Sequence, residues 1–122
     1  MSVVLDTTVL VDVLRGDRAA VGFLLGLARV PTCSEVSRVE VLEGLRPRER
    51  AAAERLFQAI AWTPVDEAIA RAAGELGRRY RASHDLGLAD LVVAATAQQL
   101  GLPLATSNVR DFPMFPRLRP PY

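Results

Sequence analysis

Residues 88–100 form the segment that most constrains the fold. The run LADLVVAATAQQL is rich in alanine, contains no proline or glycine, and is followed by Gly101 and Pro103, so it predicts a helix. Its first ten residues are apolar on nearly every side, which is typical of a helix buried in a core. Asp90 nevertheless lies in its first turn. A lone buried carboxylate is costly, so either the helix N-terminus or a cation shared with other acids must stabilise it.

Short apolar runs alternate with helical segments along the chain. This alternation predicts an α/β fold of three layers, α/β/α, with a central parallel sheet of four to five strands. The fifth strand, near Leu118, is the least supported because it lies in a proline-rich tail. The other expected strands cover 2–5, 29–33, 60–63 and 102–105, and the expected helices cover 8–16, 18–28, 35–45, 47–61, 67–80 and 88–100.

Composition excludes several classes of protein. The 122 residues are half hydrophobic and 24% charged, with a formal net charge of +1, as expected for one globular domain over residues 1–122. The absence of lysine excludes Schiff-base enzymes, the lysine-containing phosphate loop and phosphoryl-aspartate enzymes that require a lysine. The single Cys33 excludes an internal disulfide. No signal sequence or membrane-spanning run is found, so we expect a cytoplasmic protein with no membrane partner.

Several polar residues have two interpretations. Asp17, Ser34 and Asp66 are expected helix caps, with Ser37 as an alternative to Ser34. Asp12 is expected to be solvated. One of the helical glutamates, Glu40 or Glu43, could face inward, but the spacing does not say which.

Acidic residues follow the ends of several expected strands. Asp6 follows the first strand, Asp111 follows the last, and Asp90 begins the buried helix. Because the carboxyl ends of parallel strands meet at one edge of a sheet, these acids can converge there. Carboxylates without histidine or cysteine form an all-oxygen site that suits Mg²⁺ or Mn²⁺, ions that activate water and bind phosphodiesters. The alternative is that each acid only caps a helix.

Four stretches, in order, resemble the PIN-domain ribonucleases, specifically the VapC-type toxins of bacterial toxin–antitoxin pairs. They are VVLDTTVLVDVLRG with Asp6, CSEVSRVEVLEGL with Glu40 four residues before Gly44, LADLVVAATAQQLGLPLAT with Asp90, and TSNVRDF with Asp111. The resemblance covers almost the whole chain. Its departure from the family pattern is the proline-rich tail, which puts the last strand in doubt.

The resemblance carries implications for the site and its partners. It implies a ribonuclease dependent on Mg²⁺ or Mn²⁺ that hydrolyses single-stranded or looped RNA with metal-activated water. It also implies a homodimer, and inhibition by a small cognate antitoxin that packs over apolar helices near the site. The implied catalytic and metal-binding acids are Asp6, Glu40, Asp90 and Asp111, and the implied supporting polar residues are Thr7, Thr106 and Asn108.

Other functions remain as alternatives. A catalytically inactive PIN-fold binding module would share this sequence pattern. A purely structural domain would use the acids only as caps. A haloacid-dehalogenase-like phosphatase would need Asp where Thr8 stands, and a lysine that the chain lacks. Arg15 and Arg110 are candidates to hold flanking phosphates of an RNA substrate.

Overall fold

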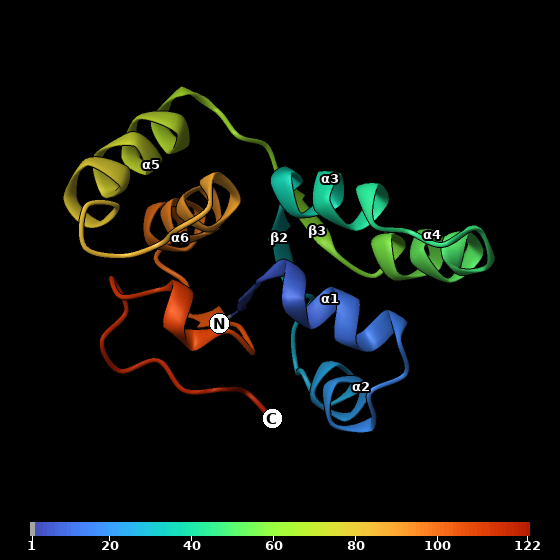
Figure 1. The fold of residues 1–122 in the computed structure, drawn as a ribbon. Helices are drawn as coiled ribbons and strands as arrows, with labels where there is room; N and C mark the ends of the chain where they lie inside the picture. Colours follow the sequence, from blue (N-terminus) through green and yellow to red (C-terminus); the bar gives the residue numbers. More distant parts are fainter. Residues whose placement is uncertain (1) are drawn as a thin grey trace.

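The computed structural model describes residues 2–122, in which short strands alternate with helices (Figure 1). The strands VL, TCS, AWT and LA combine apolar residues with serine and threonine. Several helices begin after capping residues such as Asp17, Ser34 and Asp66, whose side chains accept backbone N–H groups. In chain order the elements are β1 (Val4–Leu5), α1 (Thr7–Leu14), α2 (Arg18–Leu25), β2 (Thr32–Ser34), α3 (Glu35–Glu43), the 3₁₀ helix η1 (Pro47–Glu49), α4 (Arg50–Gln58), β3 (Ala61–Thr63), α5 (Glu67–Tyr80), α6 (Leu88–Leu100), β4 (Leu104–Ala105) and the 3₁₀ helix η2 (Val109–Asp111).

The described strands form one parallel sheet in the order β3-β2-β1-β4. Val4 of β1 is paired with Thr32 on one side and with Leu104 on the other. The chain therefore moves outward from β1 to β2 and β3, and then returns to the opposite side of β1 for β4. In open α/β sheets a reversal of this kind leaves a crevice at the carboxyl ends of the two strands, here β1 and β4.

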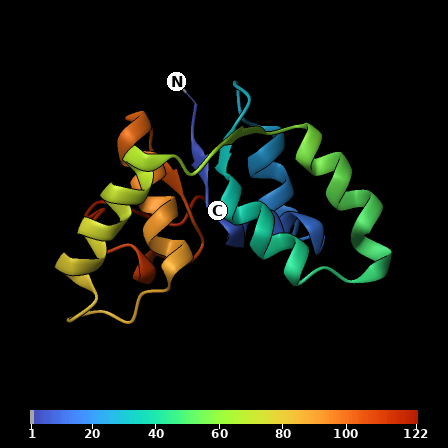
Figure 2. The ribbon, with the colours of Figure 1, turned by 90° about the horizontal axis from the view of Figure 1, so that it is seen from above.

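Side chains of the sheet alternate between two hydrophobic cores. Val4 and Leu104 pack with α5, α6 and the C-terminal segment, whereas Leu5 and Ala105 pack with α1 and α4. This alternation follows from the two-residue period of a strand. Viewed from above, α5, α6 and the C-terminal segment lie on one side of the strands and α1, α2, α3 and α4 on the other (Figure 2). The predicted three-layer α/β/α fold is thus confirmed.

Helix α6 has the bounds that the sequence predicts. Its central residues 91–97 are all buried between α5 and the sheet. Leu88, by contrast, is 70% exposed, so the first turn lies at the surface rather than in the core. The predicted burial is confirmed for residues 91–97, and the helix enters the core only after its first turn.

Other expectations also need correction. Residues 112–122 form turns and extended chain and contain no fifth strand, and prolines in this segment cannot donate to a strand ladder. Ser37 is not a cap but lies inside α3, because Ser34 accepts from the backbone N–H of Val36. The helix expected over 47–61 divides into η1 and α4. Among residues 2–122, no helix combines the length and the apolar character needed to cross a bilayer.

Candidate active site

A pocket of about 590 Å³ opens at the carboxyl ends of β1 and β4, where the order of strands reverses. Carboxylates and hydroxyls from distant parts of the chain share its walls. All four acids that the sequence singles out are among them. The lining residues are Asp6, Thr7, Thr8, Val11, Asp12, Glu40, Asp90, Ser107, Asn108 and Asp111.

Asp6 lies on the pocket floor and is 3% exposed. It precedes α1, but its side chain does not cap that helix. Instead, Oδ2 of Asp6 accepts hydrogen bonds from Oγ1 of Thr8 at 3.0 Å and from Oγ1 of Thr106 at 2.8 Å. Burial raises the pKa of Asp6, the two threonine hydroxyls and the Thr7 backbone oppose the rise, and the charge of Glu40 adds to it.

Two consecutive backbone amides orient these hydroxyls. The N–H of Ser107 donates to Thr8 Oγ1 at 3.3 Å, and the N–H of Asn108 donates to Thr106 Oγ1 at 2.9 Å. Each hydroxyl has one proton, so a threonine oxygen that accepts from an amide directs its own proton to Asp6. The loop after β4 therefore fixes the orientation of the Asp6 carboxylate.

Glu40 reaches the same pocket from α3. Its Oε1 accepts a hydrogen bond of 2.6 Å from Thr7 Oγ1, and Thr7 Oγ1 lies 2.9 Å from Oγ of Ser37, which is fully buried. Thr7 Oγ1 is thus the donor toward two acceptors, the Glu40 carboxylate and the Ser37 hydroxyl oxygen, and its one proton binds the carboxylate at the shorter distance. Glu43, which the sequence could not distinguish from Glu40, is exposed and does not line the pocket.

Asp90 both stabilises the start of α6 and lines the pocket. Its Oδ2 accepts from the backbone N–H of Gly87 at 3.1 Å, so the acid does stabilise the start of α6. Its pKa is nevertheless raised to about 6, chiefly by burial, and the Gly87 hydrogen bond only partly offsets this. The negative charges of Asp111, Asp6 and Glu40 raise it further.

Asp111 lies in η2, on the pocket wall formed after β4. Its Oδ2 accepts a short hydrogen bond from the side-chain amide of Asn108. The side chain of Asn108 thus holds Asp111. Its backbone N–H holds the Thr106 hydroxyl, which in turn donates to Asp6. One loop therefore positions two of the acids.

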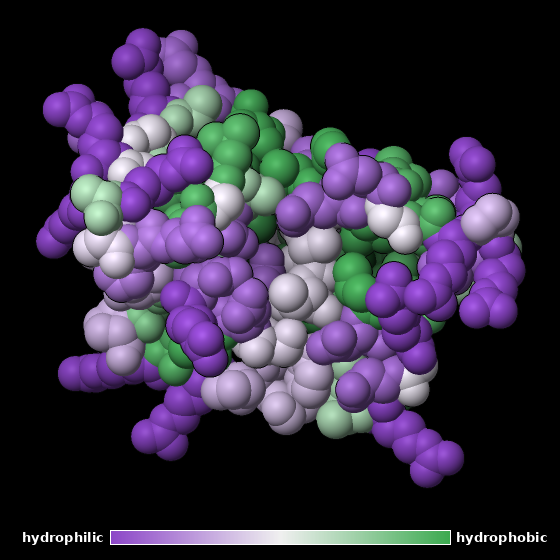
Figure 3. Space-filling model, viewed as in Figure 1, coloured by the Kyte–Doolittle hydropathy of each residue, from purple (hydrophilic) through white to green (hydrophobic). Residues whose placement is uncertain are grey.

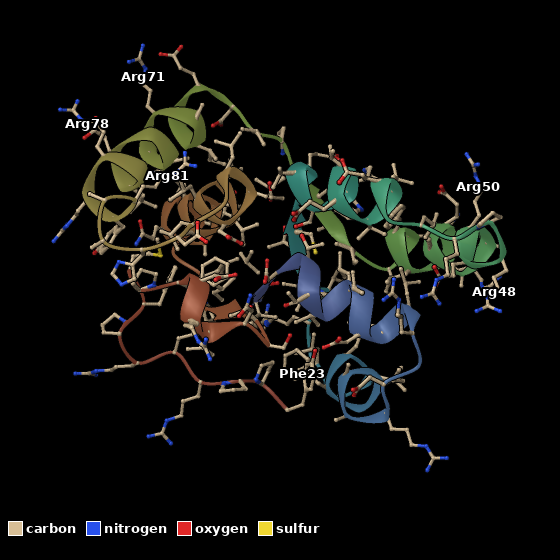
Figure 4. The ribbon with its side chains drawn as sticks, viewed as in Figure 1. Phe23, Arg48, Arg50, Arg71, Arg78 and Arg81 are labelled. Atoms are coloured by element: carbon tan, nitrogen blue, oxygen red, sulfur yellow. The ribbon has the colours of Figure 1, made fainter. Side chains whose placement is uncertain are left out.

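The pocket has no basic counterpart. None of the salt bridges formed within residues 2–122 involves an acid that lines it. Figure 4 shows the labelled Arg71 and Arg78 projecting from one end of the molecule, and Arg48 and Arg50 from the other. Uncompensated carboxylates, of which Asp6 and Asp90 have raised pKa values, favour a bound cation, because a cation relieves their repulsion.

The donor set fits a hydrated, hard divalent ion. Every charged group on the pocket is a carboxylate, and hydroxyl and amide oxygens complete its polar lining. Within residues 2–122, no three His, Cys, Asp or Glu side chains stand close enough to ligate one ion directly. Mg²⁺ usually keeps several waters and takes only one or two carboxylates, so a pocket with room for water suits it. The acids meet around one cavity rather than in a ready-made ligand cluster.

The sequence did not assign a role in the site to Thr8, Asp12 or Ser37. Thr8 and Ser37 orient Asp6 and Glu40, yet a hydroxyl in or beside a helix gives no signal of the side chain it will contact. Asp12 was expected to be solvated, which was wrong: it is half-buried, lines the pocket and accepts a hydrogen bond from Tyr122. Its four-residue spacing from Thr8, which places both on one face of α1, was the available clue.

Comparison with known proteins agrees with this architecture. The PIN domain family profile matches residues 3–118. Ribonuclease VapC19 of Mycobacterium tuberculosis is 48% identical over 122 residues, which cover 97% of this chain and 98% of the relative. Ribonuclease VapC10 of the same species is 42% identical over 123 residues, covering 98% and 92%. A toxin–antitoxin complex from Klebsiella pneumoniae contains a chain that superposes with a TM-score of 0.85 at 27% identity, covering 99% of this chain and 98% of that chain.

The chain therefore belongs to the PIN domain family. Within that family its sequence is similar to the VapC ribonucleases.

Proposed function

We propose that residues 1–122 form one PIN domain that acts in the cytoplasm as a metal-dependent endoribonuclease, the toxin of a toxin–antitoxin pair. The main support is the pocket at the carboxyl ends of β1 and β4, where the strand order reverses and carboxylates gather without a basic partner. The similar relatives are named ribonucleases, which supports RNA as the substrate. We infer that the RNA is single-stranded or looped.

In this proposal the acids hold Mg²⁺ or Mn²⁺. The metal-site acids would be Asp6, Glu40, Asp90 and Asp111. A divalent ion bound there supplies Lewis acidity, which lowers the pKa of water and stabilises charge on the phosphate oxygens. The chain's own contribution is orientation: Thr8 and Thr106 hold Asp6, and Thr7 holds Glu40. Fixing these carboxylates before substrate binds lowers the reorganisation needed during the reaction.

The proposed partners are a small cognate antitoxin and a second copy of the chain. The structural neighbour from Klebsiella pneumoniae was solved as a toxin–antitoxin complex, which supports the antitoxin. Leu25 of α2 is 79% exposed and Leu42 of α3 is 43% exposed. Figure 3 shows hydrophobic residues gathered on the face formed by α1, α3 and α4, beside the pocket. Apolar surface of this kind favours a protein partner.

Cleavage of a fluorescent single-stranded RNA tests the function. We expect cleavage with Mg²⁺ or Mn²⁺ and none with EDTA or with Asp90→Asn. Glu40→Gln should also abolish cleavage, whereas Glu43→Gln, three residues further on the same helix but outside the pocket, should cleave as the wild type does.

Calorimetry with Mn²⁺ separates the alternatives. Mn²⁺ binding that requires Asp90, in a protein that cleaves none of a broad panel of RNAs, would favour the inactive binding module. No Mn²⁺ binding at all would contradict the metal site and favour the structural interpretation of the acids.

A further inference from the structure

The C-terminal segment, residues 112–122, connects the two sides of the molecule. It begins in the core beside α6, where Phe112 and Met114 are buried. It then runs along the side of β4 and ends against α2 (Figure 1). There the ring of Tyr122 packs on Phe23 of α2, with 5.9 Å between ring centroids, and Figure 4 shows Phe23 beside the end of the ribbon.

The hydroxyl of Tyr122 reaches the wall of the acid pocket. It donates a hydrogen bond of 2.5 Å to Oδ2 of Asp12. Burial, and then the hydrogen bond and negative charge of Asp12, raise the pKa of Tyr122, while a hydrogen bond with Ser107 opposes the rise. The phenol therefore stays protonated and donating, between α1 and the loop that follows β4.

Asp12 is the fifth carboxylate of the pocket. It lies one turn beyond Thr8, whose hydroxyl holds Asp6. It forms no salt bridge with the arginines of residues 2–122, so its charge is not neutralised by a neighbour. A free carboxylate at this position would repel the phosphates of an approaching polynucleotide, and the direction in which Asp12 is held therefore matters.

We propose that Tyr122 is a positioning residue that acts through Asp12: its hydroxyl holds this carboxylate against the α1 wall and keeps it out of the path of substrate phosphates. The inference rests on the proposed ribonuclease function and deepens it. The C-terminal segment thereby supports the pocket as well as covering the core. The Phe23 contact places the phenol, and the hydroxyl provides the specific bond.

Three variants test this role in the full chain. Tyr122→Phe keeps the ring on Phe23 but removes the donor, and we expect KM for RNA to rise about three- to tenfold with kcat within about twofold, in proportion to one lost hydrogen bond. Asp12→Asn removes the charge and should leave KM at or below the wild-type value. In the double variant, KM should return to that of Asp12→Asn, because the repelling group is gone.

Equilibrium binding provides a second readout. In the cleavage-deficient Asp90→Asn background, fluorescence anisotropy with the same RNA should show the same weakening on Tyr122→Phe and the same recovery on Asp12→Asn. Tyr80→Phe on α5 is the matched control, because it also removes one tyrosine hydroxyl but lies outside the pocket, and its KM should not change.

The outcomes are distinct. If the wild type cleaves RNA and Tyr122→Phe leaves KM unchanged, the role of Tyr122 is overturned while the proposed function stands. A defect that persists in the double variant also overturns it, since the segment would then act only through folding. A wild type that cleaves no RNA overturns the proposed function, and this inference with it.

Discussion

Thr7 and Glu40 are joined by a hydrogen bond of 2.6 Å between Oγ1 and Oε1, although 33 residues separate them in the sequence. Thr7 begins α1 directly after β1, and Glu40 lies in α3 directly after β2. The pairing of these neighbouring strands, with Val4 opposite Thr32, brings the two helices together. The direction of the Glu40 carboxylate is therefore set by the register of the sheet.

Ser37→Ala should lower RNA cleavage by disturbing the hydrogen bond between Thr7 and Glu40. Without the Ser37 hydroxyl, Thr7 loses a buried hydrogen-bond partner that helps to hold its side chain beside Glu40. We expect kcat/KM for RNA cleavage to fall about tenfold, with a loss in unfolding free energy of about 1 kcal/mol. Ser34→Ala is the matched control. It removes a cap on the same helix, costs about 1 kcal/mol, and should leave kcat/KM unchanged. Equal losses of activity in the two variants would contradict the prediction.

Thr106→Val should lower the affinity for Mn²⁺. The substitution keeps the shape of the side chain but removes one of two hydroxyls that hold Asp6, whose pKa should then rise further. We expect metal binding, measured by calorimetry, to weaken about tenfold, as for one charge-assisted hydrogen bond. Thr32→Val removes the hydroxyl of another buried threonine, which donates to the Ala61 carbonyl in the sheet. Its metal affinity should match the wild type, and a comparable loss there would show that the effect is not specific to Asp6.

Stability without metal should depend on pH through Asp90. Its pKa is about 6 in the folded protein against an ordinary value of 3.8, so the folded state binds the proton more tightly. The free energy of unfolding should therefore fall as pH rises from about 4 to about 6, and the raised pKa of Asp6 acts in the same direction. Because Asp90 is half-buried and screened by solvent, we expect its share to be about 1 kcal/mol.

Denaturant titrations in EDTA across this pH range measure the effect. Asp90→Asn should flatten the slope. At pH 7.5, Mn²⁺ should raise the melting temperature of the wild type, because a ligand that binds only the folded state stabilises it, and should not raise that of Asp90→Asn. An unchanged slope in the variant would show that other groups control the pH dependence.

Two glycine substitutions should have opposite effects on stability. Gly101 ends α6 with a φ of +65°, in the left-handed region, so Gly101→Ala should cost about 1 kcal/mol. Gly74 lies inside α5, where an added methyl group meets nothing within 4 Å. Gly74→Ala should stabilise the protein by about 0.5–1 kcal/mol through helix propensity. Thermal unfolding of both variants measures these changes in stability. A higher melting temperature for Gly101→Ala would contradict the argument from the positive φ of Gly101.

Local patterns in the sequence were sufficient to predict most of the elements. The bounds of α6 follow from an uninterrupted apolar run that ends at Gly101, and the caps at Asp17, Ser34 and Asp66 follow from the same local chemistry. Alternating strands and helices predicted a parallel sheet. These features depend on neighbours within a few residues, which is why they can be recognised along the chain.

Only the tertiary structure decided which side chains meet around the pocket. Spacing could not separate Glu40 from Glu43, and only the resemblance favoured Glu40. The contacts of Ser37 with Thr7 and of Tyr122 with Asp12 depend on strand order and packing. The contacts of Ser37 with Thr7 and of Tyr122 with Asp12 join residues 30 and 110 positions apart, so no local pattern encodes them. The sequence by itself determined the elements and their acids, and the packing of those elements determined how each acid is oriented.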